Sequence, residues 1–168
     1  MYPVALDLTK IPILLAGQGE LLARRVRMLE EAGATEVHVV EDPSAADIAK
    51  ATIVMVAGLP RGEAERVAAA ARIAGKLVNV EDVNDLCDFY FTANVRRGDL
   101  IIAVSTSGAS PTLARKVRDA IGEKFGEEWR EHTDEIAARR KEWKKQGKSI
   151  SEVLAASEEY IAKKGWLS

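Results

Sequence analysis

Short apolar runs alternate with helical patterns along most of this chain. Five runs have the length and composition of β-strands: Ile11–Ala16, Val37–Val40, Thr52–Val56, Leu77–Val80 and Leu100–Val104. Between them, segments such as Leu21–Ala32 and Glu63–Ala74 repeat apolar residues at helical spacing. Continuous apolar runs are typical of strands that are buried on both faces. The alternation predicts an α/β domain with a parallel, doubly wound sheet that contains all five strands.

A glycine-containing turn joins the first predicted strand to the first predicted helix. Glycines at such a turn let the backbone approach a pyrophosphate, and the helix N-terminus supplies free N–H groups. Leu22 stands where the usual fingerprint has its third glycine, so a plain tight turn is the alternative interpretation. The candidate dinucleotide-binding residues are Gly17, Gln18, Gly19, Glu20 and Leu21.

Two acidic residues, Glu41 and Asp42, directly follow the second predicted strand. An acid at this place commonly binds the adenosine ribose of a dinucleotide. Its charge would repel the 2′-phosphate of NADP, and no arginine directly follows the strand. The sequence therefore predicts binding of NAD in preference to NADP.

Carboxylates and a cysteine follow the fourth predicted strand. Asp82 lies at the carboxyl end of that strand, where ligands bind in open α/β sheets. Asp82 is a candidate general acid or base, or else a turn residue or helix cap, and its position alone does not decide between these. Asp88 is a candidate cap or partner of backbone N–H groups. Cys87, the only cysteine, is expected to be a small core residue rather than a nucleophile.

A hydroxyl-rich turn follows the fifth predicted strand and precedes a helix that begins at Ser110-Pro111. Hydroxyls beside a helix N-terminus suit an anion or a ligand carboxylate, although helix capping alone explains Ser110. If both strands belong to one sheet, this turn and Asp82 open onto one crevice. Arg96 and Arg97 form either a solvated turn or a contact for a polyanion. The candidate substrate-binding residues are Ser105, Thr106, Ser107 and Arg115.

The remaining features exclude several classes of protein. The formal net charge is −2, which gives no reason to expect nucleic acid as a partner. No apolar run reaches the ~20 residues that span a bilayer, and no signal peptide is recognisable. One cysteine fits a reducing cytoplasm. His38 and His132 are far apart in the sequence, so we expect no resident metal site. His38 is expected to pack or to face solvent, and His132 is expected to be solvated.

Charged helical segments, 127–146 and 151–163, follow the α/β part of the chain. Their apolar stripe is thin, and we expect it to pack on the first domain or on a partner subunit. The sequence therefore predicts a homodimer. The stripe consists of Trp129, Ile136, Trp143, Val153, Leu154 and Ile161.

Three ordered motifs together resemble the precorrin-2 dehydrogenase / sirohydrochlorin ferrochelatase family, which includes the N-terminal module of siroheme synthase. The first is Leu14–Gly19 with Ala23-Arg24-Arg25 and Ala32-Gly33-Ala34 after it. The second is Val78–Asp82 followed by Leu86–Phe89. The third is Ala103–Gly108 with Ser110-Pro111 and Leu113-Ala114-Arg115.

The resemblance implies a Rossmann-like NAD-binding domain over residues 1–95, a dimerisation region over 96–125 and a helical C-terminal region over 126–168. It implies NAD-dependent oxidation of precorrin-2 to sirohydrochlorin, and many members then insert ferrous iron to give siroheme. The essential aspartate of the family falls on Asp82, and an active-site hydroxyl falls on Thr106. The iron would be a substrate held chiefly by the macrocycle.

The chain departs from the family after the second predicted strand. Asp42-Pro43 leads almost directly into the short helical segment 44–50, where family members carry an extra stretch. A sheet element is therefore expected to be missing beside the nucleotide pocket. Three alternatives stay open: a dehydrogenase without chelatase activity, a nucleotide-sensing regulatory domain without catalysis, and a structural dimer whose ligand site has decayed.

Overall fold

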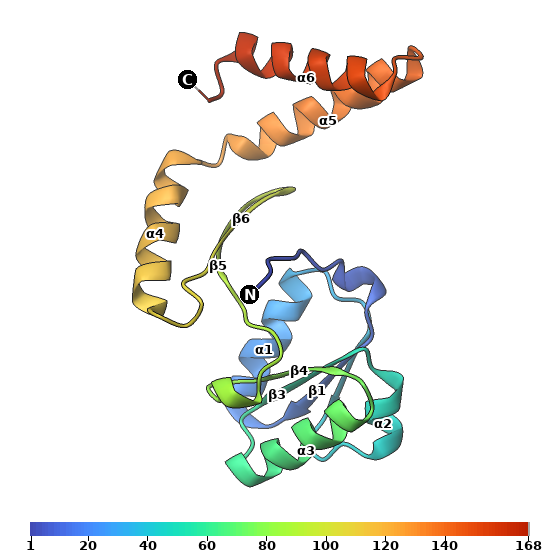
Figure 1. Ribbon diagram of the computed structural model, residues 1–168, viewed down its shortest axis with the longest axis vertical. Helices are drawn as coiled ribbons and strands as arrows, with labels where there is room; N and C mark the ends of the chain where they lie inside the picture. Colours follow the sequence, from blue (N-terminus) through green and yellow to red (C-terminus); the bar gives the residue numbers. More distant parts are fainter. Residues whose placement is uncertain (168) are drawn as a thin grey trace. The chain divides into compact units, whose positions relative to one another are not determined.

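The computed structural model describes residues 1–167, which form two compact units, Met1–Phe91 and the chain from Thr92 onward (Figure 1). The first unit is the α/β domain and the second combines a β-hairpin with three helices. The further division of the second unit into a dimerisation region and a helical region stays a prediction.

The sheet of the first unit contains four parallel strands in the order β2-β1-β3-β4. They are β1 (Ile13–Gly17), β2 (Val37–Val40), β3 (Ile53–Ala57) and β4 (Leu77–Val80). The chain runs from β1 to its neighbour β2 and then crosses to β3 on the other side of β1. The strand order therefore reverses between β1 and β3, and their carboxyl ends form the point where such sheets bind ligands.

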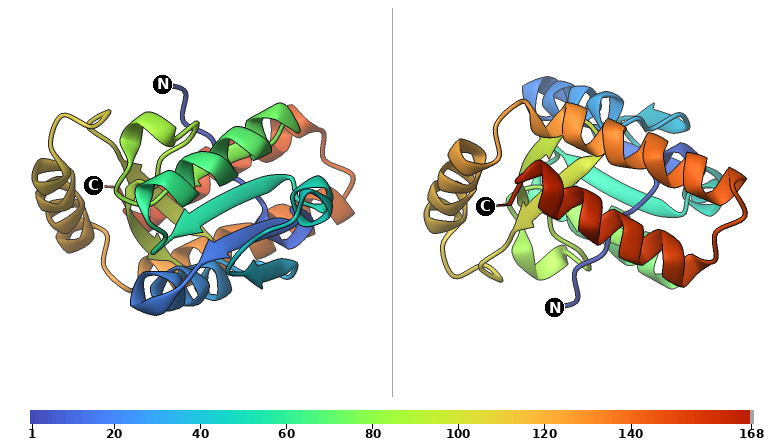
Figure 2. Two further views of the ribbon diagram at one scale, coloured as in Figure 1. Left: turned by 90° about the horizontal axis from the view of Figure 1, so that it is seen from below. Right: turned by 90° about the horizontal axis from the view of Figure 1, so that it is seen from above.

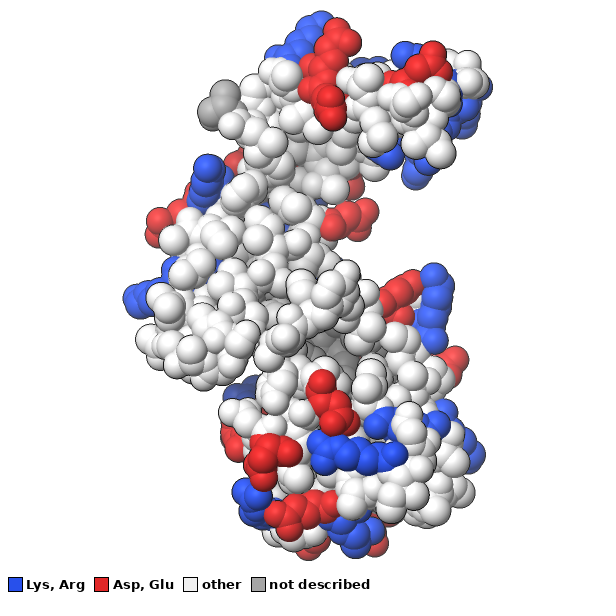
Figure 3. Space-filling model, in the orientation of Figure 1, with Lys and Arg blue, Asp and Glu red and all other residues white. Residues whose placement is uncertain are grey.

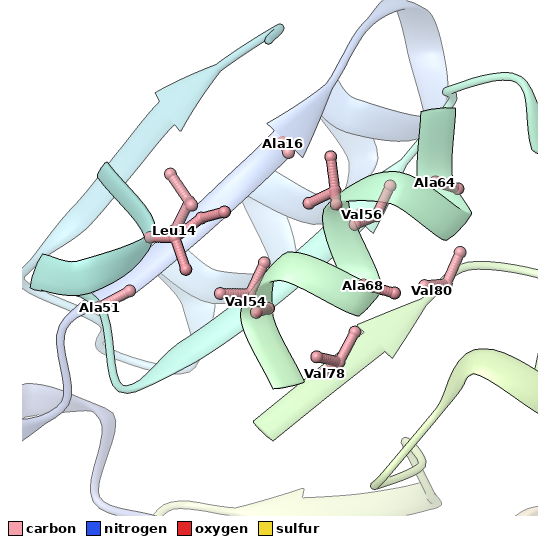
Figure 4. Packing of buried hydrophobic residues seen from close by; sticks show 12 residues of the cluster. Leu14, Ala16, Ala51, Val54, Val56, Ala64, Ala68, Val78 and Val80 are labelled. Atoms are coloured by element: carbon pink, nitrogen blue, oxygen red, sulfur yellow. The ribbon is translucent and has the colours of Figure 1, made fainter. Parts of the chain in front are cut away.

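Helices cover both faces of this sheet. The helix α1 (Gly19–Glu31) covers one face, and α2 (Ala45–Lys50) and α3 (Arg61–Ile73) cover the other. Because side chains alternate along a strand, Leu14 faces α2 and α3 whereas Leu15 packs with Leu29 of α1. Figure 4 shows the alanines of α3 that lie close to the strands, among them Ala64 and Ala68. The predicted parallel, doubly wound domain is confirmed.

The two edges of the sheet differ. On the outer side of β4, the backbone N–H of Asp88 donates to the carbonyl of Val78 at 2.8 Å. The Asp88 carboxylate in turn accepts from the Val78 N–H at 2.9 Å, so this aspartate binds backbone as one of its two interpretations predicted. The Cys87 thiol donates to the carbonyl of Val80 at 3.2 Å and packs against the core. The other edge is β2, because α2 leads directly to β3 without a further strand.

Leu100–Val104 is not a fifth strand of the parallel sheet, so that prediction is wrong. This strand, β6, pairs antiparallel with β5 (Ala93–Arg97), which the sequence interpretation missed. A parallel neighbour needs a crossover, usually a helix, whereas residues 81–92 contain only the 3₁₀ turn η2 (Asn84–Leu86). The left-handed Gly98, at φ 59°, lets the chain reverse between β5 and β6.

Three helices complete the second unit: α4 (Pro111–Lys124), α5 (Trp129–Lys145) and α6 (Ile150–Lys164). The α4 helix packs on the β-hairpin through Ala114 and Val95, both of which are buried. The α5 and α6 helices lie side by side (Figure 2). Val153 is buried between them, and Arg140 donates to the Ser157 hydroxyl at 3.1 Å. Of the thin apolar stripe, Val153 is therefore buried within the second unit, whereas Leu154 is 51% exposed.

The sequence predicted that His132 is solvated, and this prediction is wrong. The His132 ring stacks on that of Trp166 at 4.5 Å and meets the edge of the Trp129 ring at 5.3 Å. The aromatic pair fixes the end of the chain onto the start of α5. The sequence did not reveal this contact, because His132 is in α5 whereas Trp166 follows α6, so the two residues are far apart along the chain.

Candidate functional site

The glycine turn lies where the strand order reverses. The Gln18 N–H donates to the carbonyl of Ala57, at the end of β3, at 3.2 Å. A Cβ atom on Gly17 would overlap the Ala57 carbonyl oxygen and lie 2.8 Å from its carbon. A Cβ on Gly58 would likewise overlap the carbonyl oxygen of Gln18. Two glycines at neighbouring strand ends therefore let these turns pack backbone against backbone. Sequence reasoning missed Gly58, although a glycine directly after a buried strand is a usable signal.

The N-terminus of α1 is open to a ligand. No side chain caps it, because the N-cap residue is Gln18 and its side chain makes no capping hydrogen bond. Gly19 has a left-handed backbone, at φ 69°, and no atom beyond its chain neighbours and its own helix backbone lies within 4 Å of where its Cβ would be. The first N–H groups of this 13-residue helix therefore lack a side-chain cap, and the helix dipole favours an anion beside them. The neighbouring α3, whose N-cap residue is Pro60, also has no side-chain cap. These features fit the pyrophosphate of a dinucleotide.

The two acids after β2 have different surroundings. Glu41 is exposed, whereas Asp42 forms an ion pair with Arg66 of α3. The sequence interpretation had noted that no arginine directly follows β2, and the fold supplies one from a distant helix. Arg66 therefore stands beside one of the two carboxylates that are predicted to bind the ribose.

Asp82 has an unusual backbone conformation and a free carboxylate. It follows β4 with φ at 61°, in the left-handed region that non-glycine residues seldom adopt. Its side chain is exposed and makes no hydrogen bond within residues 1–167. The capping interpretation predicted a backbone partner, and none is present among these residues. Aspartate is one of the few non-glycine residues that enter this region in turns, so the backbone fits the turn interpretation as well as the acid/base one.

The residue before Asp82 is a buried carboxylate held by two arginines. The side chain of Glu81 is only 5% exposed, although it carries a charge. Arg24 of α1 donates to its Oε1, and Arg25 lies 3.2 Å from its Oε2. The hydrogen bond to Glu81 is the main cause that raises the pKa of Arg24, and the charge of Asp82 adds a smaller effect. All three residues lie in motifs of the family, but sequence reasoning assigned them no role.

The hydroxyl turn belongs to the second unit, because β6 is not part of the parallel sheet. The argument that a shared sheet edge brings this turn to Asp82 is therefore wrong. Thr106 accepts from the Ser110 N–H at 3.1 Å and donates to its carbonyl at 3.0 Å, so its hydroxyl already stabilises the turn. Ser105 accepts from the N–H of Ser107, which has a left-handed backbone at φ 52°. Ser110 caps α4 through the Leu113 N–H, as its position in the sequence predicted.

The candidate cations of the second unit also differ from one another. Arg97 packs inward, where it donates to the Gly122 carbonyl of α4 at 3.4 Å and lies 3.3 Å from Glu127. Arg96 and Arg115 are exposed. Only these two are free to meet a polyanion, so the interpretation of Arg97 as part of a solvated turn is wrong.

Other kinds of site receive no support from residues 1–167. No three of their His, Cys, Asp and Glu side chains are placed to hold a metal ion together. None of their helices is long and apolar enough to cross a membrane. On the face shown in Figure 3, acidic and basic side chains are interspersed over both units. A hollow of about 420 Å³ lies at the amino ends of β1 and β2, away from the glycine turn.

The strand order, the tight glycine turn and the uncapped helix define the first unit as an α/β domain of the dinucleotide-binding class. Residues 4–93 match the family model described as "Putative NAD(P)-binding", and residues 97–124 match the model described as "Sirohaem biosynthesis protein central". The chain belongs to this NAD(P)-binding family of sirohaem biosynthesis proteins. The family resemblance inferred from the three motifs is confirmed.

Curated relatives support this assignment, and a solved structure has the same fold. The chain is 34% identical over 139 residues to siroheme synthase of Methylococcus capsulatus, covering 71% of this chain and 29% of that protein. It is 34% identical over 140 residues to siroheme synthase 1 of Klebsiella pneumoniae, covering 71% and 30%. The chain thus spans less than a third of these relatives. The structure of SirC, a precorrin-2 dehydrogenase, has the same fold, with a TM-score of 0.75 and 22% identity over 100% of this chain and 93% of that one.

Proposed function

We propose that this protein is a cytoplasmic precorrin-2 dehydrogenase that oxidises its tetrapyrrole substrate to sirohydrochlorin with NAD. The observation that carries the proposal is the pairing of two features at the carboxyl edge of one sheet. One is the uncapped N-terminus of α1 beside Gly19, and the other is the unbonded carboxylate of Asp82. Membership of a sirohaem biosynthesis family supplies the substrate class.

Each part of the site has a proposed task. When bound, NAD accepts the hydride, and the chain supplies binding, orientation and proton transfer. Gly17, Gln18, Gly19, Glu20 and Leu21 would hold the pyrophosphate, and Glu41 and Asp42 the ribose. Asp82 would take the proton that leaves the substrate when the hydride departs. The carboxylates of the tetrapyrrole would meet the guanidinium of Arg115 and the hydroxyls of Ser105, Thr106 and Ser107 in the second unit.

Chelation is the further activity that this site would support. Insertion of ferrous iron releases two pyrrole protons, and Asp82 is again the exposed base. Iron is a substrate in this step and would be held chiefly by the macrocycle.

A direct assay tests the proposed reaction. Pure protein is incubated with precorrin-2 and NAD, and the formation of NADH is followed by its absorbance. We expect NADH and sirohydrochlorin to appear in equal amounts. Tight NAD binding without turnover would instead support the alternative of a nucleotide-sensing regulatory domain, which needs the glycine turn but not Asp82.

We expect NAD to bind more tightly than NADP. Two carboxylates, Glu41 and Asp42, would repel a 2′-phosphate, and the ion pair to Arg66 offsets only one of them. Calorimetric titration with both nucleotides measures this preference. A Glu41→Gln variant should reduce the difference in affinity between NAD and NADP. Equal or tighter binding of NADP would show that Arg66, and not the acids, meets the ribose.

We also expect a homodimer, formed through the second unit. A two-stranded sheet is marginally stable alone, and one face of this one carries exposed residues, including Ile101 at 46%. On α4, Leu113 and Val117 lie one turn apart and are 54% and 39% exposed. Light scattering should therefore give about twice the 18.3 kDa mass of one chain.

Matched variants locate this interface. Leu113→Glu combined with Val117→Glu should shift the mass toward that of a monomer. Ile73→Glu changes a side chain that is 89% exposed in the first unit, and it should leave the dimer intact. A monomer mass for the unmodified protein at micromolar concentration would contradict the prediction.

A further inference from the structure

Glu81 has no task in the site described so far, yet a charged side chain is seldom buried without a reason. It directly precedes Asp82, and its side chain is only 5% exposed. Both of its partners come from α1, the helix whose N-terminus is proposed to meet the pyrophosphate. The glutamate therefore links the candidate base to the nucleotide-binding helix.

The two arginines differ in how firmly they are held. Arg25 is 11% exposed, and its guanidinium lies over the ring of Phe91 at 4.2 Å while also donating to Met28 Sδ at 3.3 Å. Arg25 would keep these contacts without the glutamate. Arg24 is 63% exposed, and Glu81 is its only hydrogen-bonding partner within residues 1–167.

Without Glu81, the exposed Arg24 would have two acidic residues within electrostatic range. These are Asp82 and Glu20, both of which already act on the Arg24 guanidinium. Asp82 adjoins the present partner in sequence and its carboxylate has no competing hydrogen bond. A carboxylate that pairs with arginine holds protons more weakly, by a factor of ~10 or more, and is a poorer base.

We infer that Glu81 is a positioning residue that holds Arg24 away from Asp82 and so keeps the carboxylate of Asp82 free to accept a proton. The inference rests on the proposed function, because Asp82 is the base of that proposed reaction. Arg24 prefers Glu81 because the Glu81 carboxylate is almost fully shielded from water, whereas the carboxylate of Asp82 is exposed and attracts the guanidinium more weakly. Arg25 supports the arrangement by neutralising the second oxygen of the glutamate.

The test combines kinetics with a structure of the variant. Glu81→Gln should lower kcat by ~10-fold or more, because Arg24 moves onto Asp82. Adding Arg24→Gln should restore most of the lost rate, which a merely structural role of Glu81 would not allow. A crystal structure of Glu81→Gln should show the Arg24 guanidinium within ion-pair distance of the Asp82 carboxylate. Glu135→Gln removes a carboxylate that pairs with Lys164 at 2.7 Å in the second unit, and it should leave kcat unchanged.

A second, milder variant keeps the test valid if Glu81→Gln does not fold. Glu81→Asp keeps a buried negative charge but shortens the side chain by one methylene. It should release Arg24 in part and give a smaller loss of kcat, which Arg24→Gln again reverses. The inference is overturned if Arg24 stays away from Asp82 in the variant structure, or if the double variants are as slow as the single ones. Absence of turnover in the unmodified protein would instead defeat the proposed function, and the variant structure would still decide where Arg24 goes.

Discussion

Replacing Asp82 by asparagine is expected to slow NADH formation from precorrin-2 by about 10²–10⁴-fold, the usual contribution of a general acid or base. Asparagine is nearly isosteric with aspartate and tolerates the left-handed backbone at this position, where φ is 61°. The carboxylate makes no hydrogen bond within residues 1–167 that the change would break. The melting temperature and the affinity for NAD should therefore stay the same. If the protein also inserts iron, that rate should fall together with dehydrogenation.

Asp85→Asn is the matched control, since it changes an aspartate three positions further along. It breaks an exposed ion pair with Arg61, at 2.7 Å, and should leave both rates unchanged. Unchanged rates in Asp82→Asn would reduce Asp82 to a turn residue. A melting temperature lowered by many degrees would assign it a structural role. Chelation that survives while dehydrogenation is lost would give the two reactions separate bases.

Adding a single methyl group at Gly17 is expected to destabilise the first unit severely. The Cβ of Gly17→Ala would overlap the Ala57 carbonyl oxygen and lie 2.8 Å from its carbon, so β1 and β3 would have to separate at their carboxyl ends. Overpacking of a core costs about 1–3 kcal/mol, and here the clash is with rigid backbone rather than with a side chain that can rotate. The melting temperature, followed by circular dichroism, should fall by about 10 °C or more.

Gly62→Ala is the control for this prediction. No atom lies within 4 Å of the Cβ that it adds, and Gly62 is inside α3. Alanine is a better helix former by ~1 kcal/mol, so this variant should melt at the same temperature or higher. A Gly17→Ala protein that melts like the unmodified one would show that the two turns do not pack as closely as described.

Local patterns predicted most elements of the fold. The runs at β1, β2, β3 and β4 have the length and apolar character of buried strands, and these properties are local. The same holds for helix boundaries. Ser110 precedes Pro111 and caps α4, and Gly165 ends α6 in the left-handed conformation at φ 66°. Such signals work because caps and turns depend on a few neighbouring residues.

Strand pairing was less predictable. The run at β6 is apolar enough to pass for a buried parallel strand, although it belongs to a hairpin with β5. The β5 strand itself, Ala93–Arg97, contains Asn94 and two arginines and lacks an apolar pattern. Which strands become neighbours depends on the geometry of the connection, and composition carries little of that information.

The sequence by itself determined the local elements, the glycine turn and the candidacy of Asp82, because each depends on residues adjacent in the chain. Only the tertiary structure decided which charges meet. Arg66 of α3 pairs with Asp42, which follows β2. Arg24 and Arg25 of α1 pair with Glu81, and Arg24 is 57 positions away from it in the sequence. The tertiary structure also separated Asp82 and the hydroxyl turn into different units. These contacts follow from how helices pack on a sheet, since packing brings together side chains that no local pattern connects.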